Sequence, residues 1–272
     1  MSVPRGGGTK KNVSLAYRCF AAGELTQDMN GATAIAACQA VAVKASSSTA
    51  AYRRIGGFPL ATQCQAMLQK PIVMLDFETT GLSPAAGARI TEVAALRIEG
   101  GDIVDRFVSL VNCQVAVPSF ITSLTGITQR MVDSAPCVSQ VIPELLHFIG
   151  TDALAAHNAS FDEKFLLAES SALGLTPSHA QLICSLKLSR RVFPGLPSYQ
   201  LSPLTASLGI RFKGAAHRAE ADAEVSARLL LHIGDHLMRT YRASHIVPAL
   251  LARINAVSAA KVPDLLRNEF MH

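Results

Sequence analysis

Two carboxylates that lie two residues apart are the first candidates for chemistry in this sequence. Asp76 and Glu78 follow a short apolar run that begins at Ile72, and side chains two apart in a strand lie on the same face. Unit charges about 4 Å apart repel by roughly 1 kcal/mol in water and nearer 4 kcal/mol at an effective dielectric of 20. The pair therefore needs a cation or a shared proton, and hard oxygen ligands favour Mg²⁺ or Mn²⁺. Two acids at a strand end that face solvent are the alternative.

Two further acids and a histidine extend this set. Asp162 is expected in the first turn of a helix directly after a buried strand, a common place for a catalytic or ligand-binding side chain. Asp222 comes five residues after His217, so we expect the histidine on a loop and the acid in the first turns of the next helix. Each also has an ordinary explanation, because helix N-termini favour acids and histidines are common at surfaces.

The elements that would position these residues can be predicted from apolar periodicity and turn residues. Strands are expected at 72–77, 89–98, 103–111, 153–156 and 182–184. Helices are expected at 138–149, 161–173, 201–208 and 218–238. The segment Glu99–Asp102 (EGGD) favours a tight hairpin. An antiparallel hairpin followed by alternating strands and helices predicts an α/β fold with a mixed sheet and helices on its faces.

Composition excludes several classes of protein. The chain has 272 residues, of which 49% are hydrophobic and 17% are charged, which is enough to build a packed core. No run reaches the roughly 18 apolar residues that a membrane span needs. The six cysteines are too widely spaced for a zinc ribbon or a thioredoxin site. We therefore expect no membrane contact, reduced cysteines and a cytoplasmic location.

Charge and composition divide the chain into three parts. Residues 1–70 hold eight Lys/Arg and two acids, whereas the rest holds seventeen bases and eighteen acids. We predict a basic, poorly ordered N-terminal extension over 1–70, a main domain over 71–240 and a C-terminal helical segment over 241–272. A transit peptide and a start site placed too far upstream are both compatible with the extension.

Three short segments, taken together, resemble a known family. They are Asp76–Leu82 (DFETTGL), His157–Asp162 (HNASFD) and His217–Asp222 (HRAEAD), with Leu124–Thr128 (LTGIT) between the first two. In this order they resemble the DEDD family of 3′ to 5′ exonucleases in its histidine variant, typified by the proofreading epsilon subunit of bacterial DNA polymerase III. The resemblance spans about residues 71–238. It implies a ribonuclease H-like fold, in which a mixed five-stranded sheet is flanked by helices.

The resemblance also implies roles for individual residues. Four carboxylates would hold two divalent ions, Mg²⁺ with Mn²⁺ as a substitute: Asp76, Glu78, Asp162 and Asp222. His217 would be the general base that activates water. Four residues would contact the terminal nucleotide: Thr79, Thr80, Gly81 and Leu82. A plain turn between elements is the alternative explanation for these four.

The expected function is a metal-dependent exonuclease that releases nucleoside monophosphates from DNA 3′ ends, in proofreading or repair. Its partners would be single-stranded or frayed nucleic-acid ends and a DNA polymerase subunit. A 3′ to 5′ exoribonuclease stays open, since no identified residue reads the 2′-OH. A nucleic-acid- or polymerase-binding module without catalysis also stays open. A metal-dependent phosphatase would share the acids but would not need the segment at Thr79.

Other features have competing explanations. Six bases could follow a phosphate backbone or simply face solvent: Lys187, Arg190, Arg191, Arg211, Lys213 and Arg218. Asn158 could orient substrate, but we favour a cap or scaffold for the next helix. The segment Gln200–Leu204 resembles a sliding-clamp-binding pentapeptide, although its leucines suit an amphipathic helix better.

Overall fold

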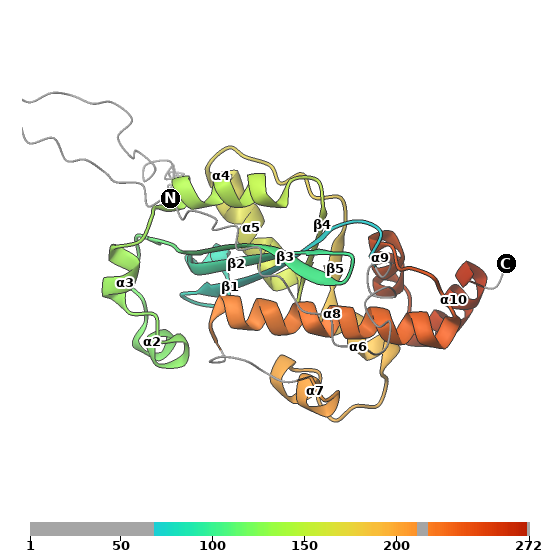
Figure 1. Cartoon of the computed structure of the whole chain (residues 1–272). Coiled ribbons are helices and arrows are strands. Elements are labelled where there is room, and N and C mark those ends of the chain that lie inside the picture. The colour runs from blue at the N-terminus through green and yellow to red at the C-terminus, as the bar shows by residue number, and fades with distance from the viewer. Residues whose placement is uncertain (1–67, 211–216, 271–272) are drawn as a thin grey trace, which may run out of the picture. The chain divides into compact units, whose positions relative to one another are not determined.

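Five strands form one mixed sheet in a computed structural model that describes residues 68–210 and 217–270. The sheet order is β3-β2-β1-β4-β5 (Figure 1). The strands are β1 (Ile72–Thr79), β2 (Ile90–Glu99), β3 (Asp102–Leu110), β4 (Ala153–Ala156) and β5 (Leu182–Cys184). β1, β2 and β3 pair antiparallel, and β4 and β5 continue the sheet in parallel. The expected mixed five-stranded sheet is confirmed.

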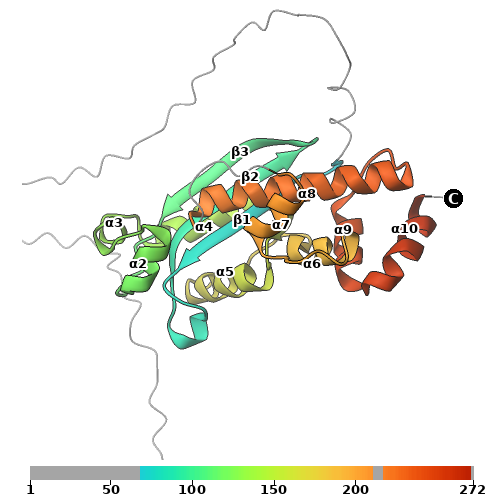
Figure 2. The same cartoon turned by 90° about the horizontal axis from the view of Figure 1, so that it is seen from below.

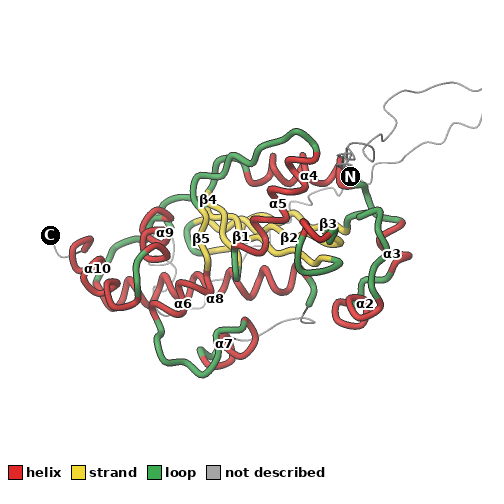
Figure 3. Tube along the Cα trace, turned by 180° about the vertical axis from the view of Figure 1, so that it is seen from behind, coloured by secondary structure: helices red, strands yellow, loops and turns green. Residues whose placement is uncertain are grey.

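Helices cover both faces of this sheet (Figures 1 and 3). The longer ones are α4 (Val138–Ile149), α5 (Ser160–Ala172), α6 (Ser185–Val192), α8 (Ala219–Tyr241), α9 (Pro248–Ala256) and α10 (Val262–Phe270). The shorter ones are η1 (Pro84–Ala86), α2 (Ser119–Thr125), α3 (Gln129–Asp133), α7 (Leu201–Ser207) and η2 (Ala259–Lys261). α4 and α5 pack on one face, and α8 runs along the other (Figure 2).

Alternation along β1 decides which face receives the acids. Ile72 and Met74 are buried in the cluster that contains the apolar residues of α8. Val73 and Leu75 are buried with α4 and α5 on the other face. Because the period of a strand is two, Asp76 and Glu78 continue the row that faces α8.

Most predicted elements agree with the structure within one to three residues. The hairpin turn forms at Gly100 and Gly101, whose φ values of 63° and 131° suit glycine. α4 and β4 have the expected bounds, and α8 continues three residues beyond Met238. The helices α2 and α3 were not predicted, since five to seven residues are too few to show a helical period.

The N-terminal extension expected over 1–70 lies outside the described residues, except for its last three. Of these, Leu68 is buried and forms a parallel bridge to Ile246, and the Gln69 N–H donates to the Ile246 carbonyl (3.4 Å). The packed part of the chain therefore begins before Pro71.

The C-terminal segment packs into the same core as α8. Leu250, Leu251 and Ile254 of α9 and Leu266 of α10 are buried there. The Asn255 amide also bonds to both the N–H (2.7 Å) and the carbonyl (3.2 Å) of Cys184 in the edge strand β5. Packing is thus the observed role of the apolar spacing in this segment. No helix in the described ranges is long and apolar enough to cross a membrane.

Candidate active site

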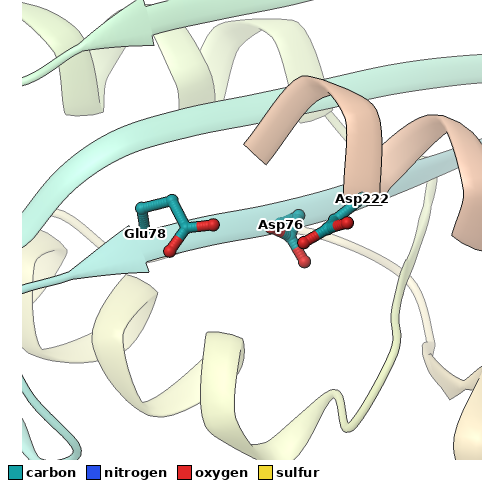
Figure 4. Close-up of side chains that lie close together, drawn as sticks. All are labelled: Asp76, Glu78 and Asp222. Carbon is teal, nitrogen blue, oxygen red and sulfur yellow. The ribbon is translucent and has the colours of Figure 1, made fainter. Parts of the chain in front are cut away.

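Three of the predicted acids come together where β1 meets the first turn of α8. One carboxylate oxygen from each of Asp76, Glu78 and Asp222 lies within 4.8 Å of the other two. Figure 4 shows the three side chains grouped between the strand and the helix. Residues 146 positions apart in sequence therefore form one acidic cluster, and each of the three is partly accessible to solvent.

Asp162 reaches the cluster from the first turn of α5. Its Oδ1 accepts a hydrogen bond from the Phe77 N–H (3.2 Å), the residue between Asp76 and Glu78. The side chain is buried, and its charge acts on Asp76. Among the described residues, however, the group of ligand atoms within 4.8 Å does not include Asp162. The structure thus puts the fourth acid beside the cluster, bound to its backbone.

The carboxylates oppose one another's ionisation. Burial and then repulsion from Asp162, Asp222 and Glu78 raise the pKa of Asp76 well above its ordinary value. Burial and the nearby acids raise the pKa of Glu78 to about 7. Burial raises the pKa of Asp162 to about 8, although the Phe77 N–H acts in the opposite direction. Without a cation, this group of acids therefore retains protons near neutral pH.

This donor set fits a divalent cation. The cluster offers hard carboxylate oxygens, the ligands that Mg²⁺ and Mn²⁺ prefer. A positive ion would also offset the repulsion that raises these pKa values. Asp76, Glu78 and Asp222 are the residues that could hold it, with Asp162 next to them.

His217 lies on the bend that leads into α8, as expected. Its φ of 63° is in the left-handed region, which is uncommon for a residue with a side chain. Its backbone N–H donates to Asp222 Oδ2 (3.1 Å), and its side chain is exposed. Burial raises the pKa of Asp222, while this bond and the His217 charge lower it. Residues 211–216, which precede His217, lie outside the described part of the chain.

The predicted nucleotide-contact segment is a turn stabilised from within. The Thr79 hydroxyl donates to the Gly81 carbonyl (2.7 Å), and Thr80 Oγ1 accepts from the Arg89 N–H (2.9 Å). Both threonines are buried, whereas the Leu82 side chain is 82% exposed. Leu82 and the backbone near Gly81 are thus the parts of this turn that a substrate could reach.

Lys164 is a neighbour of this turn that the sequence analysis did not single out. Its ammonium donates to the Leu82 carbonyl (2.6 Å) from α5 and lies over the Phe161 ring, 4.6 Å from the centroid. The only hint in the sequence that Lys164 lies near the site was its position two residues after Asp162. Only the folded turn could show that it reaches Leu82.

Glu92 is a second residue at the site that the sequence analysis missed. It lies opposite Glu78 in the β1–β2 register, and its side chain is only 3% exposed. A charged residue inside the apolar run Ile90–Ile98 was the signal that could have revealed it, since a buried charge requires partners.

Two residues of the segment His157–Asp162, His157 and Asn158, make hydrogen bonds within the fold. His157 Nδ1 lies 2.9 Å from Ser185 Oγ, and Nε2 lies 3.1 Å from the Tyr199 carbonyl. Burial lowers the pKa of this histidine. The expected side-chain cap from Asn158 is not formed, because the N-cap residue of α5 is Ala159 and no side chain caps it. Asn158 instead accepts the Phe161 N–H at its backbone carbonyl (2.8 Å).

The segment Leu124–Thr128 divides between surface and core. Ile127 is buried in a small cluster with Cys113 and Val132, whereas Leu124 is 51% exposed. Thr128 Oγ1 caps α3 by accepting the Met131 N–H (3.3 Å). Ile127 is therefore the residue of this segment that packs into that apolar cluster.

The basic residues have different contacts, and Arg211 and Lys213 lie outside the described part of the chain. Arg191 Nε donates to the Val257 carbonyl (2.6 Å), Arg190 lies over the Tyr199 ring, and Arg218 pairs with Glu92. Lys187 is exposed on α6. The segment that resembles a clamp-binding peptide begins α7, where Leu204 is fully buried, which agrees with the amphipathic helix.

Comparison with known proteins identifies the family. The sequence pattern of the exonuclease family RNase_T matches residues 73–230, more than half of the chain. The chain therefore belongs to this exonuclease family, and the resemblance drawn from the three short segments is confirmed.

Two DNA polymerase III proteins and a 3′-5′ exonuclease are similar in sequence. DNA polymerase III PolC-type from Caldanaerobacter subterraneus subsp. tengcongensis is 37% identical over 182 residues, covering 66% of this chain and 13% of that protein. The 3′-5′ exonuclease DinG from Bacillus subtilis is 36% identical over 171 residues, covering 63% and 18%. DNA polymerase III subunit epsilon from Aquifex aeolicus is 33% identical over 175 residues, covering 64% and 86%. The chain thus spans under a fifth of the first two relatives.

Solved exonuclease structures share the fold. Exonuclease X in complex with 5′-overhanging duplex DNA aligns with a TM-score of 0.54 and 29% identity, covering 70% of this chain and 99% of that one. The nuclease domain of 3′hExo, a DEDDh family member bound to rAMP, aligns with a TM-score of 0.54 and 25% identity, covering 60% and 91%. Both matches agree with the ribonuclease H-like sheet described above.

Proposed function

We propose that this chain is a metal-dependent 3′ to 5′ exonuclease that releases nucleoside monophosphates from DNA 3′ ends. The observation that carries the proposal is the meeting of Asp222 from α8 with Asp76 and Glu78 from β1. Asp162, bonded to the backbone between those two acids, completes a set of four carboxylates. In a chain of this exonuclease family, such a set is best explained as a phosphodiesterase site.

The proposed resident ions are two Mg²⁺, with Mn²⁺ as a substitute. Four carboxylates would hold them: Asp76, Glu78, Asp162 and Asp222. Divalent ions bound there would lower the pKa of water and offset the charge of the scissile phosphate. The burial of Asp162 and its bond to Phe77 would keep its oxygens aimed at the same place as those on β1.

His217 is the proposed general base. Its side chain is exposed next to Asp222, and histidine is the side chain that most often takes a proton from a reacting group in catalysis. The water oxygen then forms a bond to phosphorus, and the bond from phosphorus to the 3′ oxygen of the preceding nucleotide breaks. That 3′ oxygen takes up a proton, and the terminal nucleotide leaves as a 5′-monophosphate.

The turn after β1 is the proposed contact for the terminal nucleotide. Thr79 and Thr80 would shape the turn through their internal bonds, because both hydroxyls are already used within the chain. The backbone near Gly81 and the exposed side chain of Leu82 would meet the sugar and the base.

DNA is the favoured substrate because exonuclease X, whose structure contains duplex DNA, covers 70% of this chain at 29% identity. An exoribonuclease is the second candidate, since the related 3′hExo domain was solved with rAMP. A DNA polymerase is the partner to test, because one relative is a DNA polymerase III subunit. The expected place of action remains the cytoplasm.

The deciding experiment is hydrolysis of matched DNA and RNA oligonucleotides, labelled at either the 3′ or the 5′ end, with Mg²⁺ or with excess EDTA. We expect the 3′-labelled DNA to release labelled mononucleotide at once and the 5′-labelled DNA to shorten stepwise. Asp76→Asn and Asp222→Asn should fold and lose several powers of ten in turnover, because metal ions contribute several kcal/mol to such reactions. Full activity in EDTA would overturn the metal site. If neither DNA nor RNA is hydrolysed, the chain is not a nuclease, and the alternative of a nucleic-acid- or polymerase-binding module without catalysis is favoured.

A further inference from the structure

The carboxylate of Glu92 is buried at the site, although it is not one of the clustered metal-ligand candidates. It lies on β2 beside Glu78, within an apolar strand. Its charge adds to the repulsion that raises the pKa of Asp76 and Glu78. A buried charge is costly unless it is paired and hydrogen-bonded. The partners of Glu92 therefore indicate what it does.

Among the described residues, the hydrogen-bond partners of the Glu92 carboxylate lie at the beginning of α8. Arg218 Nε lies 3.2 Å from Oε1 and 3.1 Å from Oε2, and Nη2 lies 2.5 Å from Oε1. The Ala219 N–H donates to Oε2 (3.0 Å). The N-cap residue of α8 is Arg218, whose own side chain makes no capping bond. Glu92 thus caps α8 from a strand 127 residues away in sequence.

The helix start that Glu92 holds carries two proposed catalytic groups. His217 directly precedes Arg218, in a left-handed backbone conformation that costs free energy unless its surroundings stabilise it. Asp222 lies in the first turn of α8, where it accepts the His217 N–H. A shift or rotation of this turn would therefore move both Asp222 and the imidazole.

We infer that Glu92 and Arg218 are positioning residues for phosphodiester hydrolysis: together they fix the first turn of α8 so that Asp222 faces Asp76 and Glu78 and His217 stays at the edge of the cluster. The inference rests on the proposed function. It also implies that Arg218 binds Glu92 and does not bind the phosphate backbone of the substrate. The Arg218 guanidinium already donates hydrogen bonds to both oxygens of the Glu92 carboxylate.

The test compares Glu92→Gln, Arg218→Ala and Arg218→Lys with the full-length wild type. Asp152→Asn is the matched control, because Asp152 pairs with Arg97 at the other end of the same strand, away from α8. Four quantities are measured: the melting temperature, kcat and KM on a single-stranded oligonucleotide, the salt dependence of DNA binding, and amide hydrogen exchange along α8.

We expect Glu92→Gln and Arg218→Ala to lower kcat about tenfold or more and to change KM less than about threefold, since small misplacements of reacting groups are costly. Arg218→Lys should have a higher kcat than Arg218→Ala, because lysine keeps the positive charge next to Glu92. Exchange should accelerate over 219–223 and stay unchanged over 229–238. Asp152→Asn should lower the melting temperature without lowering kcat.

Different results overturn the inference. If Arg218→Ala raises KM at constant kcat and reduces the salt slope by about 1, Arg218 contacts phosphate. If Glu92→Gln matches Asp152→Asn in both kcat and melting temperature, the pair only stabilises the fold. Failure of the proposed function is separable: a wild type that cleaves neither DNA nor RNA refutes the nuclease, whereas the exchange measurement still shows whether Glu92 orders the first turn.

Discussion

At the scale of single residues, the four acids have pKa values that only a folded protein could produce. Asp162 and Glu78 have ordinary pKa values of 3.8 and 4.5, and in the structure these rise to about 8 and about 7. Burial is the largest cause for both. Protons therefore bind the metal-free folded state more tightly than the unfolded chain, which is the reverse of a salt-bridged carboxylate.

The first prediction concerns pH. Because the folded state holds more protons than the unfolded state between about pH 4 and about pH 8, these groups make stability fall as pH rises through that range. We expect the melting temperature in EDTA to decline more steeply from pH 5 to pH 8 for the wild type than for Asp162→Asn, whose side chain can still accept the Phe77 N–H. Added Mg²⁺ should reduce the decline. If the melting temperature of the wild type declines no more steeply with pH than that of Asp162→Asn, the raised pKa of Asp162 is contradicted.

The second prediction concerns His217. Replacing it by Ala should lower turnover by about 10²- to 10⁴-fold, the usual contribution of a general base. Metal-dependent binding of single strands should persist, since the imidazole moves a proton and need not hold an ion. Turnover and Mn²⁺ affinity are measured in parallel, with the exposed His147 of α4 replaced by Ala as the control. If metal affinity falls as far as turnover does, His217 is a ligand instead.

At the scale of elements, α5 supports the site in two ways. Its first turn supplies Asp162, and Lys164 two residues later binds the Leu82 carbonyl. Further along α5, the buried Glu169 pairs with Arg89 (2.7 Å), where the turn after β1 rejoins β2. One helix thereby fixes both an acid of the site and the turn that presents Leu82 to solvent.

The third prediction follows from this link. Lys164→Met keeps the apolar stem and removes the donor to Leu82, so the turn should loosen while the acids stay in place. We expect KM for an oligonucleotide to rise about three- to tenfold, with kcat within about twofold, because such changes remove uniform binding. Lys261→Met, at an exposed lysine in η2, is the control.

A double mutant tests the same link. If Lys164 acts through Leu82, Lys164→Met combined with Leu82→Ala should raise KM less than the product of the two single effects, since coupled residues are not additive. Full additivity would mean that Lys164 meets the substrate independently of Leu82.

At the scale of the whole molecule, segments far from the motifs complete the core. Leu68 bridges Ile246, and the apolar residues of α9 and α10 pack with α8. These contacts bring the two ends of the described chain onto the face of the sheet that carries the acids. A domain cut at 71 and 240 would remove them.

The fourth prediction compares chains that begin at Gln65 and at Pro71 with the full length. Both should retain nuclease chemistry, because all proposed catalytic residues follow Pro71. The Pro71 chain should be less stable by about 1.5–3 kcal/mol, the value of burying one leucine side chain. Both should bind DNA with weaker salt dependence, since most of the basic excess of 1–70 is gone.

Urea unfolding and turnover on a short oligonucleotide at two salt concentrations check these expectations. If the Gln65 chain unfolds at much lower urea than the full length, residues before Gln65 pack as structure, and the predicted extension is wrong.

Local patterns in the sequence were enough to identify the fold and the family. Strand and helix periods arise from neighbouring residues, so the five strands and most of the longer helices could be predicted from the sequence alone. The segments that contain Asp76, Asp162 and Asp222 indicated an exonuclease, because their residues and their order resemble the motifs of that family.

Only the tertiary structure decided which residues meet. The bond between Glu92 and the start of α8, the reach of Lys164 to Leu82, and the bridge from Leu68 to Ile246 join residues 82 to 178 positions apart. No local period encodes such contacts, since they depend on how sheet and helices pack. For the same reason the raised pKa of Asp162 could not be read from its sequence neighbours: it comes from burial, which exists only once the chain has folded.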